Sequence, residues 1–181
     1  MRTFLAIDIP EKIQIEISRQ LQSLQEEYPQ LNWVPYENYH LTLFFLDEKT
    51  EGELKQIISE IDRGLFDIPL FHLYPHNLDL FINEKIDLYV SFQREKMLET
   101  MVRRLRSSLL YEPKQKFVPH LTIAKHKIPS KQQYFVLKKK LNNTIIDFDL
   151  PVKKIYLYQT VIRDNKPSYK RLATFPLLRE R

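Results

Sequence analysis

His40-Leu41-Thr42-Leu43 and His120-Leu121-Thr122-Ile123 are two copies of one pattern, His-apolar-Thr-apolar, within a single chain. Because side chains alternate between the two faces of a β-strand, the His and the Thr of each copy share one face. The two apolar residues then point to the opposite face, into a core. Each copy therefore predicts a strand that presents one imidazole and one hydroxyl on the same side.

The surroundings of the two copies follow the same order, which indicates an internal structural repeat. A strand pattern at 2–9 precedes the first motif and another at 86–92 precedes the second, and a helical pattern follows each strand. Such a repeat predicts pseudo-two-fold symmetry, with the two histidines across one cleft. Two facing motifs would supply a general base, a general acid and two hydroxyl donors for phosphate oxygens.

Hydrophobic periodicity predicts the elements around the motifs. In the first strand, Leu5, Ile7 and Ile9 share one face, and Phe4 and Ala6 share the other. Apolar stripes predict helices through residues 13–24, 54–61, 97–109 and 134–141. Capping boxes at Thr50/Glu53 and Ser130/Gln133 begin the second and fourth of these helices. The tail predicts two strands, 155–161 and 169–177, joined by a turn at 164–167.

Length and composition predict one domain, residues 1–181, made of two lobes. A hydrophobic fraction of 43% and a charged fraction of 28% fit a folded globular protein. The net charge of +5 favours an anionic partner such as nucleic acid, although solubility alone explains it equally well. The absence of cysteine excludes disulfides and thiolate chemistry and fits a cytoplasmic location.

Two further classes are disfavoured by the sequence. The apolar stretch 4–9 is interrupted by Asp8 and is too short for a signal peptide or a membrane span, so we expect no membrane partner. Gly52 and Gly64 are the only glycines, and a Gly-rich phosphate loop cannot be built from them. Any phosphate must therefore be bound by side chains.

A metal site competes with acid–base catalysis for the two histidines. Zinc and non-haem iron sites usually need a third ligand, often a carboxylate, and threonine is a poor ligand for these metals. No His-x-Asp or His-x-Glu occurs in the chain, so we expect neither a metal nor a cofactor. Two structural, hydrogen-bonded histidines are the other alternative, but that alternative does not explain why both precede Leu-Thr on comparable strands.

Beyond the paired motif, the chain resembles a known family along nearly its whole length. The resemblance rests on Arg2–Pro10, Trp33–Leu43, Phe117–Ala124 and Pro167–Leu177. It is to the 2H phosphoesterase superfamily, and in particular to the RNA 2′,3′-cyclic phosphodiesterases that are also called 2′-5′ RNA ligases. The resemblance implies a bilobal α+β fold, in which two pseudo-symmetric lobes of antiparallel sheet with outer helices surround a central cleft. It also implies metal-free opening of a cyclic phosphate to a 2′-phosphomonoester.

The resemblance assigns roles that the residues alone leave open. It implies that His40 donates a proton to the leaving 3′-oxygen and that His120 accepts a proton from water. Two imidazoles suit this chemistry because their ordinary pKa lies near 6.5, so that one can be neutral while the other is charged. The sequence is symmetric and does not choose between the two. Thr42 and Thr122 are the expected phosphate-binding hydroxyls, a role compatible with their strand-forming tendency.

Two more residues are candidates for the phosphate. Lys125 stands where the family often has arginine, but strict strand alternation places it on the face opposite His120, so the role requires a bulge or a strand end. Tyr169 belongs to the closing segment of the resemblance, and tail packing is its alternative role.

Three ring side chains are assigned by register. Phe4 and Phe44 are expected on the cleft face, Phe44 because it continues the alternation of His40 and Thr42. There they could stack on bases, with core packing as the alternative. His126 falls in register with the second motif and is expected at the surface, with a contact to nucleic acid as the alternative role.

The residues and the resemblance together predict an RNA 2′,3′-cyclic phosphodiesterase. Its expected partners are RNA ends or nucleotides that carry a cyclic phosphate, and we expect a monomer. Within the same fold, the alternatives are a small cyclic-nucleotide phosphodiesterase and the reverse reaction, 2′-5′ RNA ligation. From another class, the alternative is an RNA- or nucleotide-binding module without turnover, which would need neither a proton donor nor a proton acceptor.

Overall fold

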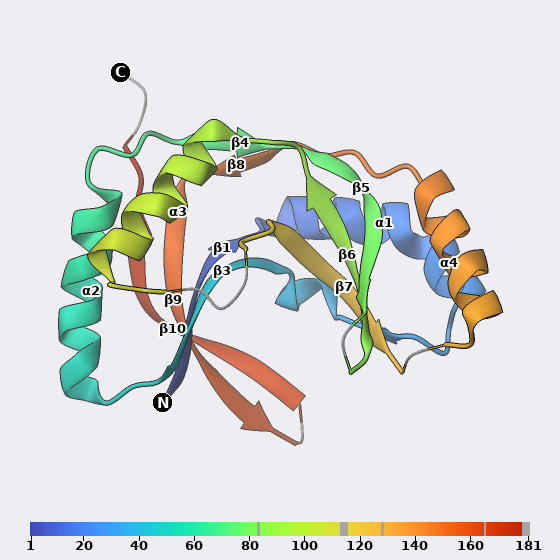
Figure 1. Cartoon of the computed structure of the whole chain (residues 1–181), viewed down its shortest axis with the longest axis horizontal. Coiled ribbons are helices and arrows are strands. Elements are labelled where there is room, and N and C mark those ends of the chain that lie inside the picture. Colours follow the sequence, from blue (N-terminus) through green and yellow to red (C-terminus); the bar gives the residue numbers. More distant parts are fainter. Residues whose placement is uncertain (83, 113–115, 128, 165, 179–181) are drawn as a thin grey trace.

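The computed structural model describes residues 1–82, 84–112, 116–127, 129–164 and 166–178. Two four-stranded antiparallel sheets and a two-stranded ribbon form its β-structure (Figure 1). The first sheet has the order β10–β9–β1–β3, from Lys166–Pro176, Lys154–Arg163, Arg2–Asp8 and His40–Glu48. The second has the order β2–β7–β6–β5, from Asn32–Trp33, His120–His126, Ile86–Phe92 and Pro75–Ile82. The ribbon pairs β4 with β8, from Phe71–Leu73 and Leu150–Val152.

The described helices lie outside the sheets. They are α1, α2, α3 and α4, from Glu11–Glu27, Glu51–Leu65, Lys96–Ser108 and Lys131–Asn143, with a short 3₁₀ turn, η1, at Tyr36–Asn38. Both predicted capping boxes are present, at the starts of α2 and α4. In the part of the chain that the structure describes, no helix has both the length and the apolar character needed to cross a membrane. The mixed α+β class and the antiparallel sheets are as predicted.

The two faces of β1 separate two apolar clusters. Leu5 and Ile7 join a single large core that extends through both sheets. Phe4 and Ala6 point the other way and form a small cluster with Tyr158 on the opposite face of the first sheet. The alternation predicted for this strand is therefore confirmed, and the smaller cluster marks the sheet face that carries the first motif.

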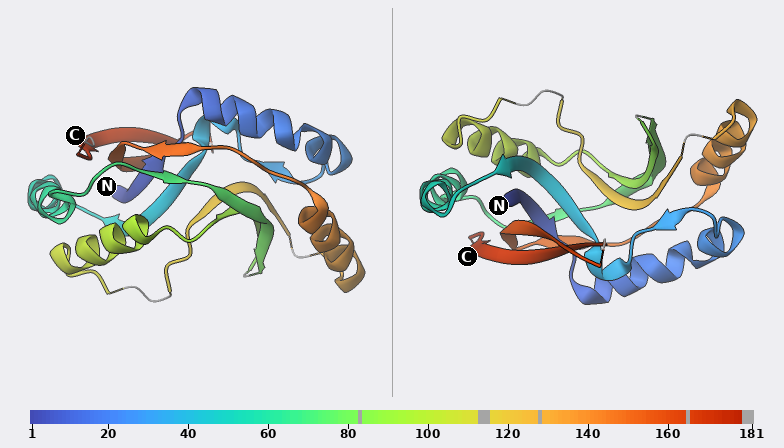
Figure 2. Two further views of the ribbon diagram at one scale, coloured as in Figure 1. Left: turned by 90° about the horizontal axis from the view of Figure 1, so that it is seen from above. Right: turned by 90° about the horizontal axis from the view of Figure 1, so that it is seen from below.

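Each end of the molecule carries one helix from the first half of the chain and one from the second half. In Figures 1 and 2, α2 and α3 lie together at one end, and α1 and α4 lie together at the other. Gly64 of α2 packs so closely on α3 that an added Cβ would lie 3.0 Å from Ser108 Oγ. At the opposite end, Glu27 of α1 pairs with Lys140 of α4 at 2.5 Å. Each end thus combines one helix from each half of the chain.

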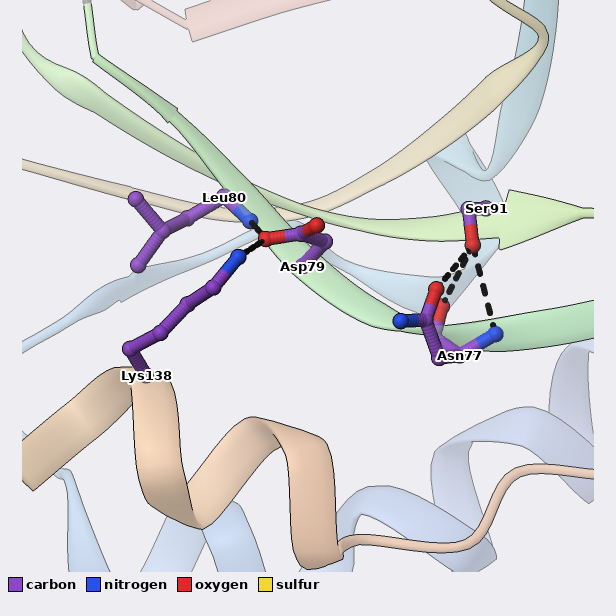
Figure 3. A network of polar contacts seen from close by, with 5 residues as sticks. All are labelled: Asn77, Asp79, Leu80, Ser91 and Lys138. Atoms are coloured by element: carbon purple, nitrogen blue, oxygen red, sulfur yellow. Dashed lines mark hydrogen bonds and ion pairs between the residues drawn. The ribbon is translucent and has the colours of Figure 1, made fainter.

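The charge run 138–140, which the sequence suggests is a solvated face, partly anchors α4. Lys138 pairs with Asp79 of β5 (Figure 3), and Lys140 reaches α1. Asp79 lies on a strand that hydrophobic patterning does not predict. Its polar residues His76, Asn77 and Asp79 obscure the alternation, and β5 exists because β6 offers it a full edge to pair with.

A β-bulge interrupts β3 directly after the first motif. Thr42 pairs with Ala6 of β1, but the next pair is Phe44 with Leu5, so Leu43 is an extra residue without a partner on β1. An extra residue in one strand reverses the alternation beyond it. Phe44 therefore turns into the core, and Phe45 takes the face of His40 and Thr42.

The second motif strand carries the same irregularity at the same position. Thr122 of β7 pairs with Tyr89 of β6, and the next pair is Ala124 with Leu88, which leaves Ile123 as the extra residue. Lys125 thereby returns to the face of the motif. The two strands are thus equivalent in backbone from the histidine to the fifth residue after it.

Candidate active site

The two motifs line one cavity of about 350 Å³ between the sheets. His40 and Thr42 come from β3, and His120 and Thr122 come from β7. The rest of the lining comes from both sheets and the loops beside them, and it includes Arg2, Thr3, Phe4, Val34, Asn38, Phe45, Asp87, Lys125, Thr160 and Tyr169. The cleft predicted from the repeated motif is therefore formed.

Both imidazoles are oriented in the same way. Nδ1 of His40 donates to the carbonyl of Asn38 at 2.8 Å, and Nδ1 of His120 donates to the carbonyl of Val118 at 2.7 Å. Because a carbonyl oxygen can only accept, each Nδ1 must carry a hydrogen. Nε2 is then the nitrogen of each ring that gains or loses a proton.

Aromatic rings hold each imidazole in place. The centroid of His40 lies 5.1 Å from that of Phe4 and 5.0 Å from that of Tyr169, which meets it edge-on. On the other side, His120 meets Phe81 and Tyr89 edge-on at 5.2 and 5.6 Å, and those two rings stack at 4.0 Å. Packing of this kind restricts the ring rotamers and so fixes the direction in which each imidazole points.

Burial lowers the pKa of His40 below its ordinary value of 6.5. The hydrogen bond to the carbonyl of Asn38 and the negative charge of Asp8 act in the opposite direction and raise this pKa. The positive charge of Lys125 lowers it further, as does His120 whenever that ring carries a proton. The neutral form of His40 is therefore favoured relative to a free imidazole.

The cleft-face placement predicted for Phe44 is wrong, and the alternative role, core packing, is the one that the structure shows. Phe44 is 2% exposed and packs edge-on against Tyr111 in the core, with ring centroids 5.0 Å apart. The bulge at Leu43 is the physical reason, since strict alternation fails beyond it. The aromatic residue that lies at the cleft is Phe45, which is 64% exposed.

Phe4 lies on the predicted face of β1, but it does not offer an open surface to a base. Its ring is 3% exposed and packs against His40, Tyr158 and Tyr169. Phe4 therefore forms the floor beneath the first histidine. Tyr169 lines the cleft beside the same histidine.

The bulge also corrects the placement of two residues of β7. Lys125 lies in the cleft rather than on the opposite face, 3.7 Å from the carboxylate of Asp87. His126 in turn lies on the other side of the strand, where it lines a hollow with Gln133 and Leu137 of α4.

Phe45 is one of several residues at or beside the cleft that were not predicted as site residues from the sequence. Thr160 lines the cleft, and Asp8, Tyr158 and Arg171 line a hollow of about 260 Å³ that adjoins it at His40. Asp8 did leave a signal, because it is a carboxylate in an otherwise apolar strand. Thr160, Tyr158 and Arg171 gave no such signal in the sequence. They come near the cleft only because β9 and β10 pair beside β1 in the sheet.

The donor set of the cleft offers protons and hydroxyls rather than a ligand cage. Among the residues that the structure describes, no three His, Cys, Asp or Glu side chains gather closely enough to hold a metal ion. The arrangement can bind a phosphate through hydroxyls and a lysine ammonium, and can transfer protons on two sides of it.

Two antiparallel sheets that each present a His-x-Thr strand to one cleft define a phosphoesterase of the two-histidine class. Residues 7–85 match the family described as LigT like Phosphoesterase. Along nearly the whole chain, 31% of residues are identical to the RNA 2′,3′-cyclic phosphodiesterase of Methanocaldococcus jannaschii, with 94% of this chain and 97% of the relative covered. The protein of the same name from Thermotoga maritima is 29% identical, covering 94% and 92%. The chain belongs to the LigT-like phosphoesterase family.

Solved structures agree with this fold. Escherichia coli LigT superimposes with a TM-score of 0.76 at 22% identity, covering 97% of this chain and 96% of that one. A protein of Thermus thermophilus gives 0.77 at 23% identity, covering 98% of both chains. LigT has also been crystallised with 3′-AMP, and that complex gives a TM-score of 0.74 at 22% identity over 97% of each chain.

Proposed function

We propose that this protein hydrolyses terminal 2′,3′-cyclic phosphates of RNA to 2′-phosphomonoesters, by paired-histidine catalysis without a metal ion. The observation that carries the proposal is the pair of equivalent imidazoles in one cleft, each with Nδ1 occupied by a carbonyl and Nε2 left for proton transfer. The names of the relatives supply the substrate. Escherichia coli LigT has been crystallised with 3′-AMP, a ribonucleotide that carries a phosphomonoester.

The reaction needs one proton removed and one supplied. Nε2 of His120 takes a proton from water, and the water oxygen forms a bond to phosphorus. The bond from phosphorus to the ribose 3′-oxygen breaks, and that oxygen takes a proton from Nε2 of His40. The products are a 2′-phosphomonoester and a 3′-hydroxyl, and one water is consumed. Exchange with solvent then returns the proton from His120 to His40.

The remaining cleft residues divide between phosphate and base. Thr42 and Thr122 donate to the phosphoryl oxygens, and the ammonium group of Lys125 attracts the phosphate charge. Tyr169 stands beside His40 and can donate to the same phosphate. The exposed ring of Phe45 offers a stacking surface for the terminal base.

One assay tests the activity. Purified protein is incubated with a mononucleotide 2′,3′-cyclic phosphate and with an oligonucleotide that ends in one, and the products are identified. We expect 2′-phosphates, with turnover unchanged in excess EDTA. Loss of turnover in EDTA that a divalent ion restores would contradict the metal-free mechanism, and the absence of hydrolysis of either substrate would leave the binding-module alternative.

Variants test the two histidines. His40→Ala and His120→Ala should each lose about 10²–10⁴-fold in kcat, the usual contribution of a positioned acid or base. Because both act on one concerted step, the double variant should lose much less than the product of the single losses. A folded His120→Ala protein with wild-type turnover would contradict the mechanism.

A sulfur substitution separates the acid from the base. In a cyclic substrate whose bridging 3′-oxygen is replaced by sulfur, the leaving thiolate needs little protonation. We expect this substrate to restore most of the activity that His40→Ala loses, and to restore little for His120→Ala. The reverse pattern would exchange the two roles.

A further inference from the structure

The strand pairs that carry the two motifs place different residues opposite the two histidines. In the first sheet, Asp8 of β1 lies directly opposite His40 of β3. In the second, Ser91 of β6 lies directly opposite His120 of β7. The two pairs are equivalent, since each is followed at the same spacing by the same bulge. Side chains that face each other across antiparallel strands have Cβ atoms about 4.5–5.5 Å apart and interact directly.

The carboxylate of Asp8 is fixed by two contacts. Its Oδ1 accepts a hydrogen bond from the backbone N–H of Ile9 at 3.2 Å. Its Oδ2 lies 3.3 Å from the guanidinium of Arg171, which sits 4.4 Å above the ring of Tyr156. Asp8 and Arg171 line the same hollow as His40. A negative charge is thus held at the edge of the site, beside the first imidazole.

Ser91 provides no charge at the equivalent position. Its hydroxyl donates to the carbonyl of Asn77 at 3.1 Å and accepts from the N–H of Asn77 at 3.2 Å, as Figure 3 shows. The two motifs are therefore equivalent in backbone but differ in the side chain that lies opposite each histidine. A carboxylate faces His40, and a neutral hydroxyl engaged with β5 faces His120.

Other titratable groups also face His40, from every element packed around it. They are Glu37 of η1, Arg2 of β1, Asp87 of β6, His120 and Lys125 of β7, Tyr158 of β9, and Tyr169 and Arg171 of β10. Burial and the cations of β7 oppose protonation of the ring, and a nearby anion favours it. Asp8 is the carboxylate that the sheet places directly across from the ring.

We propose that Asp8, held by Arg171, is a positioning residue that keeps His40 able to carry a proton, and that this asymmetry makes His40 the proton donor and His120 the acceptor. The assignment rests on the proposed function for its chemistry. It deepens that function by naming the group that decides the direction of proton flow. Arg171 has a double effect, because it orients the carboxylate but also offsets part of its charge.

The first test reads the protonation of His40 without turnover. The five histidine rings are titrated by NMR, and the His40 signal is assigned with His40→Ala. Asp8→Asn keeps the shape of the side chain and the acceptor for the Ile9 N–H but removes the charge. The midpoint of the His40 titration should therefore fall by about one pH unit. Ser91→Ala, the matched change in the second lobe, should leave it in place.

The second test reads catalysis. At pH 8 the rate is proportional to the protonated fraction of His40, so Asp8→Asn should lose up to about tenfold on the oxygen substrate. On the 3′-sulfur substrate the same variant should keep nearly full activity. An unchanged or raised His40 midpoint in Asp8→Asn, or an equal loss on both substrates, would overturn the inference. Because the wild-type enzyme would still hydrolyse the cyclic phosphate in that case, this failure differs from failure of the proposed function.

Discussion

At the scale of single residues, Phe44 and Phe45 are neighbours that the bulge at Leu43 sends to opposite faces of β3. Phe44→Ala should lower the free energy of unfolding by about 3–5 kcal/mol, because it empties a core site. Phe45→Ala should leave stability nearly unchanged and should instead raise KM, since stacking on one base is worth about 1–3 kcal/mol. Chemical denaturation and steady-state kinetics measure both effects. Equal losses of stability in the two variants would contradict the bulge.

The lowered pKa of His40 has a direct kinetic consequence. In its proposed role as the proton donor, His40 must be protonated, so the rate should fall as pH rises through its pKa. In His120→Ala the residual activity should have no acidic limb, and the alkaline limb of kcat/KM should lie below pH 6.5, the ordinary imidazole value. The alkaline limb of kcat should lie at higher pH than that of kcat/KM, because the bound phosphodiester adds a negative charge beside His40. An alkaline limb of kcat/KM well above 6.5 in this variant would contradict the role.

The residues that the sequence could predict are those for which local alternation suffices. His40, Thr42, His120 and Thr122 lie before any irregularity, so period two places them correctly. Beyond the motif, the predicted face of each side chain is wrong. A bulge is a property of two paired strands, and the sequence of one strand does not show which of its residues lacks a partner on the other. Phe45 and Lys125 both lie beyond it.

At the scale of elements, helix α2 contains both glycines of the chain in opposite environments. Gly52 has open space around its Cβ position, so Gly52→Ala should stabilise the protein by about 0.5–1 kcal/mol through helix propensity. Gly64→Ala should destabilise it by about 1–3 kcal/mol, because the new methyl would lie 3.0 Å from Ser108 Oγ and 3.2 Å from Leu105 Cδ2. Thermal melts of the two variants test the α2–α3 contact, and a stabilised Gly64→Ala would contradict it.

The elements with strong local signals were the predictable ones. The starts of helices α2 and α4 were predicted from capping boxes, and the structure contains both boxes. The strands that were missed depend on partners far along the chain. β2 is only two residues long and is defined by its pairing with β7, and β4 and β8 define each other across a long stretch of the sequence. Local patterning contains no information of that kind.

At the scale of the whole molecule, the net charge of +5 bears on the choice of substrate. An RNA end should be preferred over a mononucleotide, since each phosphate neutralised by a cation releases counterions. For the oligonucleotide, the logarithm of kcat/KM should fall with the logarithm of salt concentration with a slope of about −0.7 per phosphate contact. Equal efficiency on both substrates without salt dependence would favour the small cyclic-nucleotide phosphodiesterase.

The exchange of helices between the two ends bears on the order of folding during synthesis. The last residue of α1 is synthesised roughly a hundred residues before the first residue of α4 (27 to 131). Helix α1 therefore cannot pack beside α4 until most of the chain has been made. Two separate copies of one half could complete each other only by trading helices, as domain-swapped dimers do. Joining the halves in one polypeptide makes that trade intramolecular and independent of protein concentration. The arrangement of the four helices is the one that a domain-swapped dimer of two such halves would have.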